Sequence, residues 1–129
     1  MDTVLALSAA QLAAYNSQDI DAFCACFAEN VRVLDEAGEV SIAGIEDFRA
    51  RYDALFAKWP SMGASVLSRI HLEPHVVEHE AYFRKDAGGV IQESGEVIVR
   101  YTRQGDRIAL VEFLRPQSSL IETAEPRPS

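Results

Sequence analysis

The sequence predicts an α+β protein in which three helices precede a run of antiparallel strands. Up to about residue 59, apolar residues recur at helical spacing, and from about residue 64 they alternate with polar residues as in strands. Turn-forming runs at residues 86–89 and 104–106 separate the strand-like segments. This order favours helices packed against one face of an antiparallel sheet.

The first and third helices carry the clearest patterns. The first is expected from about residue 3 to residue 15, with Tyr15 at the end of its apolar stripe. The third follows Gly44, and Pro60 lies just past its end. Its apolar face consists of Ile45, Phe48, Tyr52, Leu55 and Trp59.

Residues 16–38 combine a helix start, a turn and a strand. Asp19 is a suitable N-cap for a short helix whose apolar face is made of Ile20, Phe23 and Phe27. The pattern then changes, and Val31, Val33 and Asp35 share one face of a strand because side chains alternate along it. The sequence therefore predicts a carboxylate on the core-facing side of that strand.

Further strands are expected at residues 40–43, 64–73, 76–85, 90–103 and 107–115, with a bend or bulge near Gly95. We expect one domain over residues 1–115. Residues 116–129 hold three prolines and little hydrophobic content, which predicts a mobile or surface-draped tail.

The last strand is apolar on both faces. One face must meet the helices, and the other needs a cover. A second copy of the chain is the simplest cover, so we expect a homodimer built on the outer face of the sheet.

Composition narrows the class of partner. A chain of 129 residues with 48% hydrophobic content is large enough for one packed core. Its net charge of −8 argues against nucleic acid or an anionic membrane surface as a partner. The N-terminus has no basic, signal-like segment and no apolar run reaches membrane-spanning length, so a cytoplasmic location is expected.

Residues 16–38 resemble the helix–loop–strand core of the nuclear transport factor 2-like superfamily, which includes ketosteroid isomerases and polyketide cyclases of the SnoaL type. The residues that match ketosteroid isomerases without a gap are Asn16, Asp19, Asp21, Phe27, Ala28, Asp35 and Gly38. The resemblance covers about residues 3–115. It implies a cone-shaped, curved, mostly antiparallel sheet with the three helices on its concave face, and it places Asp35 at the position of the general base.

The chain departs from the isomerases at the groups that stabilise the enolate. The tyrosine of their first helix is replaced by Gln11, with Tyr15 one turn further on, and their late acid falls in the apolar run at residues 97–99. Tyr15 and Tyr101 are candidate substitute donors, although tyrosines on apolar stripes are also common in cores.

Two interpretations of Asp35 stay open. Beside valines, and under an apolar wall formed by Tyr15, Phe56 and Trp59, its carboxylate would be desolvated and usable as a base. Alternatively, Asp35 starts the turn that continues to Gly38, a position where aspartate is common.

His79 and Glu112 are the remaining candidates. His79 shares a face of its strand with Val77 and Ala81 and is expected to point into an apolar environment, where it could donate a hydrogen bond. Glu112 lies between leucines, as a buried acid of the pocket or as the partner of an arginine such as Arg100 or Arg69. The histidine spacing matches no ligand motif, so we expect neither metal nor cofactor.

Together these features predict a small-molecule enzyme that uses Asp35, aided by His79, for proton transfer on a hydrophobic, carbonyl-type substrate. The expected pocket residues are Gln11, Tyr15, Phe56, Trp59, Tyr101 and Glu112. Two alternatives remain: a non-catalytic binder of a small hydrophobic molecule, and a dimeric interaction module.

Overall fold

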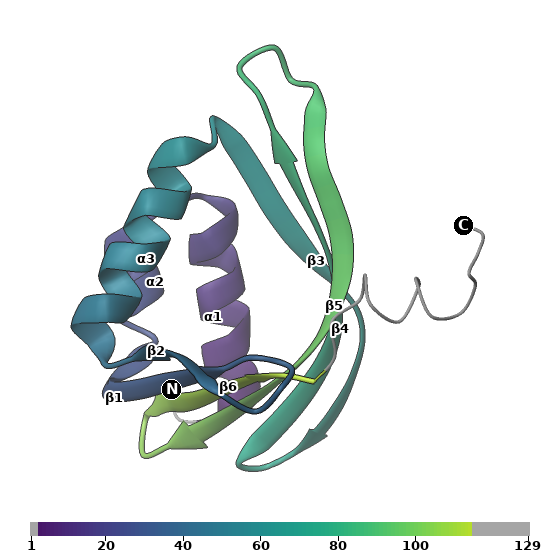
Figure 1. The fold of residues 1–129 in the computed structure, drawn as a ribbon. Helices are drawn as coiled ribbons and strands as arrows, with labels where there is room; N and C mark the ends of the chain where they lie inside the picture. Colours follow the sequence, from purple (N-terminus) through teal and green to yellow (C-terminus); the bar gives the residue numbers. More distant parts are fainter. Residues whose placement is uncertain (1–2, 115–129) are drawn as a thin grey trace.

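Three helices lie against the concave side of a curled sheet in the computed structural model, which describes residues 3–114 (Figure 1). The elements in chain order are α1 (Val4–Asn16), α2 (Ile20–Cys24), β1 (Phe27–Leu34), β2 (Val40–Ala43), α3 (Ile45–Lys58), β3 (Ser61–Leu72), β4 (His75–Lys85), β5 (Ile91–Gln104) and β6 (Arg107–Phe113). The tail predicted at residues 116–129 lies outside the described residues.

The sheet has six strands in the order β2-β1-β6-β5-β4-β3. Strands β1 and β6 pair in parallel, and all other neighbouring strands pair antiparallel. The sheet curls around the helices without closing into a barrel (Figure 1). The prediction of a cone-shaped, mostly antiparallel sheet with three helices on its concave face is confirmed.

Helix α1 is fixed to the sheet at its first turn. The hydroxyl of Thr3 caps the helix by accepting a hydrogen bond from the backbone N–H of Ala6 at 3.1 Å. The N–H of Val4 donates to the carboxylate of Glu73, which precedes the turn into β4, at 2.9 Å. The carboxylate suits the positive end of the helix dipole, and it sets the position of α1 over the sheet.

The second helix is shorter than the sequence pattern indicates. It ends at Cys24, and Phe27, which continues its helical spacing, already belongs to β1. The backbone explains the difference, because Cys26 accepts a hydrogen bond from the N–H of Ile108 and Phe27 pairs with Ile108 on β6. Sheet pairing satisfies these backbone groups where a longer helix would have left β6 without its partner.

An aromatic cluster joins the helices to the sheet. The ring of Phe23 lies at its centre, with the centroids of five other rings 4.9–6.0 Å away, those of Tyr15, Phe27, Phe48, Tyr52 and Phe56. These separations are typical of favourable aromatic pairs. The cluster makes the helical side of the core a rigid aromatic wall.

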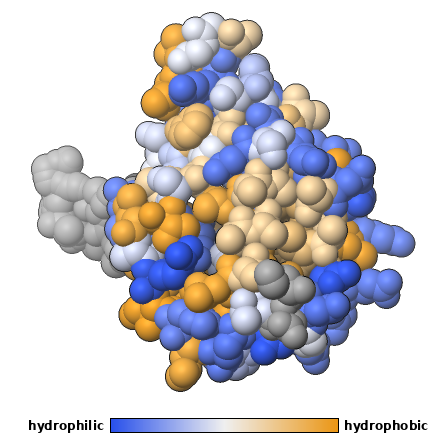
Figure 2. All heavy atoms as spheres, turned by 180° about the vertical axis from the view of Figure 1, so that it is seen from behind, coloured by the Kyte–Doolittle hydropathy of each residue, from blue (hydrophilic) through white to orange (hydrophobic). Residues whose placement is uncertain are grey.

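The outer side of the molecule carries several exposed apolar side chains. Ile70 and Leu72, near the end of β3, are 75% and 77% exposed. From behind, hydrophobic and hydrophilic groups are interspersed over the surface (Figure 2). No helix within residues 3–114 is both long and apolar enough to cross a membrane. The predicted homodimer stays a prediction.

Candidate functional site

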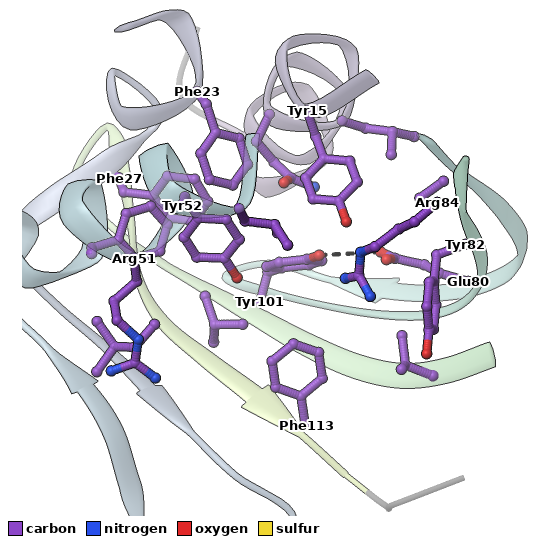
Figure 3. A pocket seen from close by; sticks show the side chains of 18 residues that line it. Tyr15, Phe23, Phe27, Arg51, Tyr52, Glu80, Tyr82, Arg84, Tyr101 and Phe113 are labelled. Carbon is purple, nitrogen blue, oxygen red and sulfur yellow. Dashed lines mark hydrogen bonds between the residues drawn. The ribbon is translucent and has the colours of Figure 1, made fainter. Parts of the chain in front are cut away.

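A cavity of about 410 Å³ lies between the helices and the concave face of the sheet. Every helix and strand named above contributes at least one lining residue. The side toward α2 and α3 is mainly apolar and aromatic, with Phe23, Phe48 and Leu55. The side toward β4 and β5 is polar (Figure 3). The cavity therefore has one wall for apolar contact and one that can form hydrogen bonds.

Glu80, in the middle of β4, is the carboxylic acid of the polar wall. Its side chain lines the cavity although the residue is only 7% exposed. The hydroxyl of Tyr101 on β5 donates a hydrogen bond to its Oε2 at 3.1 Å. Burial raises the pKa of Glu80 to about 8, and a hydrogen bond with Glu78 and the charge of Glu78 act in the same direction. At neutral pH Glu80 is mainly a neutral acid.

Glu78 lies behind Glu80 on the same face of β4 and is completely buried. Its Oε2 accepts hydrogen bonds from the Ser8 hydroxyl at 3.0 Å and from Arg69 at 3.0 and 3.2 Å. Its Oε1 accepts from no N–H or protein hydroxyl group within residues 3–114. The carboxyl group of Glu80, two residues along the same face of the strand, is the neighbour that a protonated form would make a donor. The buried Glu78 therefore favours the protonated form of Glu80.

Arg84 supplies the positive charge of the polar wall. Its Nη1 donates to Oε1 of Glu93 at 2.8 Å, and its guanidinium lies 4.8 Å from the centroid of the Tyr82 ring. The hydroxyl of Tyr15, on α1, points toward this guanidinium (Figure 3). Burial raises the pKa of Tyr15, and Arg84 opposes part of that rise. Tyr15 therefore stays protonated at neutral pH.

Tyr52 and Arg51 bring polar groups from α3. Tyr52 extends its hydroxyl into the space that Tyr101 and Arg84 also face (Figure 3). Burial raises the pKa of Tyr52, so its hydroxyl also remains a donor. Arg51 is exposed, and its Nη1 donates to the carbonyl of Ser41 at 3.2 Å.

Three of the predicted pocket residues line the cavity: Gln11, Tyr15 and Tyr101. Two others lie beside it. Phe56 is buried in the core with its ring centroid 5.7 Å from that of Tyr15. Trp59 is half-buried, and its carbonyl accepts a hydrogen bond from Gln18 at 2.8 Å. The helical periodicity identified residues on the side of the helices that faces the sheet. It could not distinguish the residues that line the cavity from those packed behind them.

Asp35 is placed in the turn after β1. Its Oδ1 accepts hydrogen bonds from the backbone N–H groups of Ala37 and Glu39 at 2.9 and 3.0 Å. It is not among the residues that line the cavity. This geometry agrees with the interpretation of Asp35 as a turn residue. Strand β1 ends at Leu34, so the alternation of side chains along the strand no longer applies to Asp35. A catalytic role for Asp35 stays a prediction, and no contact of Asp35 with the cavity supports it.

The predicted direction of His79 needs correction. Its Nε2 forms a hydrogen bond with Oε1 of Glu96 at 2.7 Å, and it alternates with the inward-facing Glu78 and Glu80. The inner face of β4 is therefore the more polar one. This is possible because Ser8, Arg69 and Tyr101 give the two glutamates hydrogen-bond partners.

Glu112 lies opposite Arg100 on the neighbouring strand, and Nε of Arg100 donates to its Oε1 at 2.8 Å. It does not line the cavity. Glu112 therefore pairs with an arginine across the sheet, which was the alternative in the prediction. Its predicted place in the pocket is corrected.

The prediction missed Glu78, Glu80, Tyr52 and Arg84 as site residues. Tyr52 was assigned to the apolar face of its helix. A signal for the glutamates existed: residues 76, 78, 80 and 82 share one face of a strand, and that face holds two acids between Val76 and Tyr82. Two like charges so placed are either both solvated or both buried with partners.

Metal-ligating side chains do not converge within residues 3–114, where no group of three histidine, cysteine, aspartate or glutamate residues could hold an ion. His71 is bound to Glu73 at 2.8 Å and His75 to Thr102 at 2.9 Å. Each of these histidines has a local hydrogen-bond partner.

An open, curled sheet wrapped around three helices with a cavity between them defines the nuclear transport factor 2-like class. Within this class the chain belongs to the family described as the SnoaL-like domain, whose model matches residues 9–111. No curated protein matches the sequence.

Solved structures show the same fold. An uncharacterized cystatin fold protein from Novosphingobium aromaticivorans has 28% identity and a TM-score of 0.78, over 89% of this chain and 100% of its own. A putative polyketide cyclase from Sinorhizobium meliloti has 19% identity and a TM-score of 0.67, over 83% of this chain and 92% of its own. A computationally designed 17-OHP binder has 13% identity and a TM-score of 0.77, over 92% and 95%.

Proposed function

We propose that this protein is a small-molecule enzyme that transfers a proton on a largely apolar, carbonyl-type substrate held in the cavity, with Glu80 as the acid–base group. The observation that carries the proposal is the position of Glu80: a buried carboxylic acid that lines the cavity and is hydrogen-bonded to Tyr101. An acid in such a site can exchange a proton with a bound molecule.

The acidity of Glu80 supports this role. A general acid or base works best when its pKa lies near the working pH, and burial raises the pKa of Glu80 to about 8. Both protonation states are then accessible near neutrality. Glu78 cannot replace it, because Glu78 is completely buried and is held by Ser8 and Arg69.

The tyrosines could stabilise the charge that develops on a substrate oxygen. The hydroxyls of Tyr15 and Tyr52 face the cavity in Figure 3, and burial keeps both protonated. One positioned donor contributes about 3 kcal/mol to transition-state stabilisation in enzymes of this kind. These donors take the place of the enolate-stabilising groups that the sequence lacks at the isomerase positions.

The size and lining of the cavity support the substrate class. A volume of about 410 Å³ is in the range of sites for small organic molecules. The aromatic wall around Phe23 and Phe48 offers apolar contact. A relative described as a putative polyketide cyclase and a designed binder of 17-OHP share the fold, which is consistent with an apolar substrate.

The catalytic test is solvent deuterium exchange. A panel of apolar ketones is incubated with the protein in deuterated buffer, and incorporation next to the carbonyl is followed by NMR. We expect exchange to fall about a hundredfold or more in Glu80→Gln. The matched control is Glu96→Gln on the outer face, which should leave the rate unchanged because Glu96 contacts His79 away from the cavity. Exchange that persists in Glu80→Gln would remove the proposal.

A non-catalytic binder is the second candidate. It is favoured by the hydrogen bond between Tyr101 and Glu80, which already satisfies one oxygen of the acid within the protein. Panel members that bind to the wild-type protein without exchanging protons would support this alternative.

The homodimer and the cytoplasmic location also remain proposals. The exposed side chains of Ile70 and Leu72 at the end of β3 support an outer-face contact between copies. Sedimentation should give a dimer that weakens in Ile70→Glu. A stable monomer at micromolar concentration would contradict the dimer.

A further inference from the structure

Arg84 is the cation of the polar wall, and its contacts with the protein involve only part of its guanidinium group. Arg84 is bound to Glu93 through Nη1, and the side chain of Glu93 is 49% exposed. The Nε of Arg84 is buried and has no hydrogen-bond partner within residues 3–114. This Nε is covered by protein, so a molecule in the cavity would reach the guanidinium through its terminal N–H groups, where it would compete with Glu93 as the acceptor.

Apart from Glu93, the groups beside the guanidinium of Arg84 are neutral: two tyrosines and an acid. Tyr15 points its hydroxyl toward the guanidinium, and Tyr82 lies against it at 4.8 Å (Figure 3). Glu80, the nearby acid of the wall, is mainly neutral at pH 7. Arg84 places a positive charge on the cavity wall, and the carboxylate that pairs with it, Glu93, is 49% exposed and is not among the residues that line the cavity. A cation on the wall of a cavity can attract an anionic group of a bound molecule.

We propose that Arg84 and Tyr15 form a carboxylate-binding subsite, and that the ligand is an apolar carboxylic acid whose body lies against the aromatic wall. The planar guanidinium is suited to a carboxylate, because its N–H groups match the spacing of the two oxygens. The hydroxyl of Tyr15 supplies a further donor. The body of the ligand would then reach Phe23 and Phe48, which line the cavity.

The subsite also explains why a cation is placed beside Glu80. This inference rests on the proposed function, since it makes the substrate an acid that carries its carbonyl group near Glu80. A carboxylate held by Arg84 would orient the apolar body in one direction along the cavity. It would leave Glu80 free to exchange a proton, because it is Arg84 and not the acid that carries the anchoring contact.

The experiment compares matched ligand pairs by isothermal titration calorimetry at pH 7. The probes are 1-naphthoate, 2-naphthoate and 3-phenylpropanoate, each with its neutral primary amide. We expect at least one acid to bind about tenfold to a hundredfold more tightly than its amide, the effect of a charge-assisted hydrogen bond. In Arg84→Gln the preference should disappear, and in Tyr15→Phe it should fall severalfold.

Two further variants distinguish a loss of the Arg84 contact from a general loss of structure. Glu93→Gln removes the competing carboxylate from Arg84 and should strengthen the preference for the acid severalfold. Arg100→Gln, on the outer face with Glu112, removes a similar ion pair and should change nothing. Equal binding of acids and amides, no binding of any probe, or an unchanged preference in Arg84→Gln would each overturn the subsite.

The same measurements in Glu80→Gln separate this inference from the catalytic proposal. An acid preference that persists in Glu80→Gln supports the subsite whether or not the wild-type protein exchanges protons. Loss of the preference in that variant would assign the selectivity to Glu80 and overturn the role of Arg84. Failure of proton exchange alone would contradict the catalytic role of Glu80 and leave the subsite standing.

Discussion

The two walls of the cavity are built on different principles. The helical wall is an aromatic cluster centred on Phe23, in which apolar contact alone is sufficient. The sheet wall holds Glu78 and Glu80 in nearly complete burial, and it needs Ser8, Arg69 and Tyr101 as partners. The first wall provides stability. The second carries the acid of the proposed proton transfer at a cost in stability, because buried acids disfavour the ionised state.

The largest expected effect falls on the aromatic wall. Phe23→Ala should lower the free energy of unfolding by about 3–5 kcal/mol, because it leaves a cavity at the centre of five rings. Urea denaturation measures the change. A loss below about 1 kcal/mol would show that the wall repacks easily and that the two walls differ less than their composition indicates.

In the polar wall, the substitution Glu80→Gln should raise the stability of the protein, whereas Phe23→Ala lowers it. The pKa of Glu80 is raised in the folded protein, so its contribution is present at low pH and is lost as pH rises from about 4.5 to about 8. Glu80→Gln should remove this loss and stabilise the fold above pH 8 by on the order of 3 kcal/mol.

Unfolding curves recorded between pH 4 and pH 9 provide the measurement for Glu80→Gln. Glu96→Gln is the matched control, since Glu96 is exposed on the outer face and paired with His79. A wild-type curve whose pH dependence is unchanged by Glu80→Gln would mean that the acid is not buried in a neutral form.

Tyr101→Phe should give a smaller effect on the same wall. Its hydroxyl donates to Glu80, and this hydrogen bond holds the pKa of Glu80 lower than burial alone would. Removing it should raise that pKa further and cost about 1–2 kcal/mol of stability. An NMR titration of the Glu80 side chain measures the shift, and a downward shift would contradict the hydrogen-bond assignment.

The smallest effect is expected at Asp35, which belongs to neither wall. Asp35→Ala removes two hydrogen bonds to turn N–H groups and should cost about 1 kcal/mol or less. Deuterium exchange and probe binding should be unchanged. A loss of exchange comparable to that in Glu80→Gln would restore the original prediction that this aspartate handles the proton.

The sequence by itself determined the elements and their arrangement. Helical spacing after Gly44 predicted α3 within one residue at its C-terminal end, and the turn residues at 86–89 and 104–106 separated β4, β5 and β6. Such patterns are local, because the period of a helix or strand is set by the backbone itself. Gln11, Tyr15 and Tyr101 were also expected in the pocket, Gln11 from the comparison with the first helix of the isomerases and the two tyrosines as substitute donors.

Only the tertiary structure decided which face of β4 points inward and which acid enters the cavity. In β4 the hydrophobic pattern favoured Val77 and His79 as the inner face, but Glu78 and Glu80 occupy it. Their burial depends on partners far away in the sequence: Ser8 on α1, Arg69 on β3 and Tyr101 on β5. A single strand cannot reveal whether its polar residues will meet such partners, because hydrogen bonds between distant elements exist only after the chain has folded.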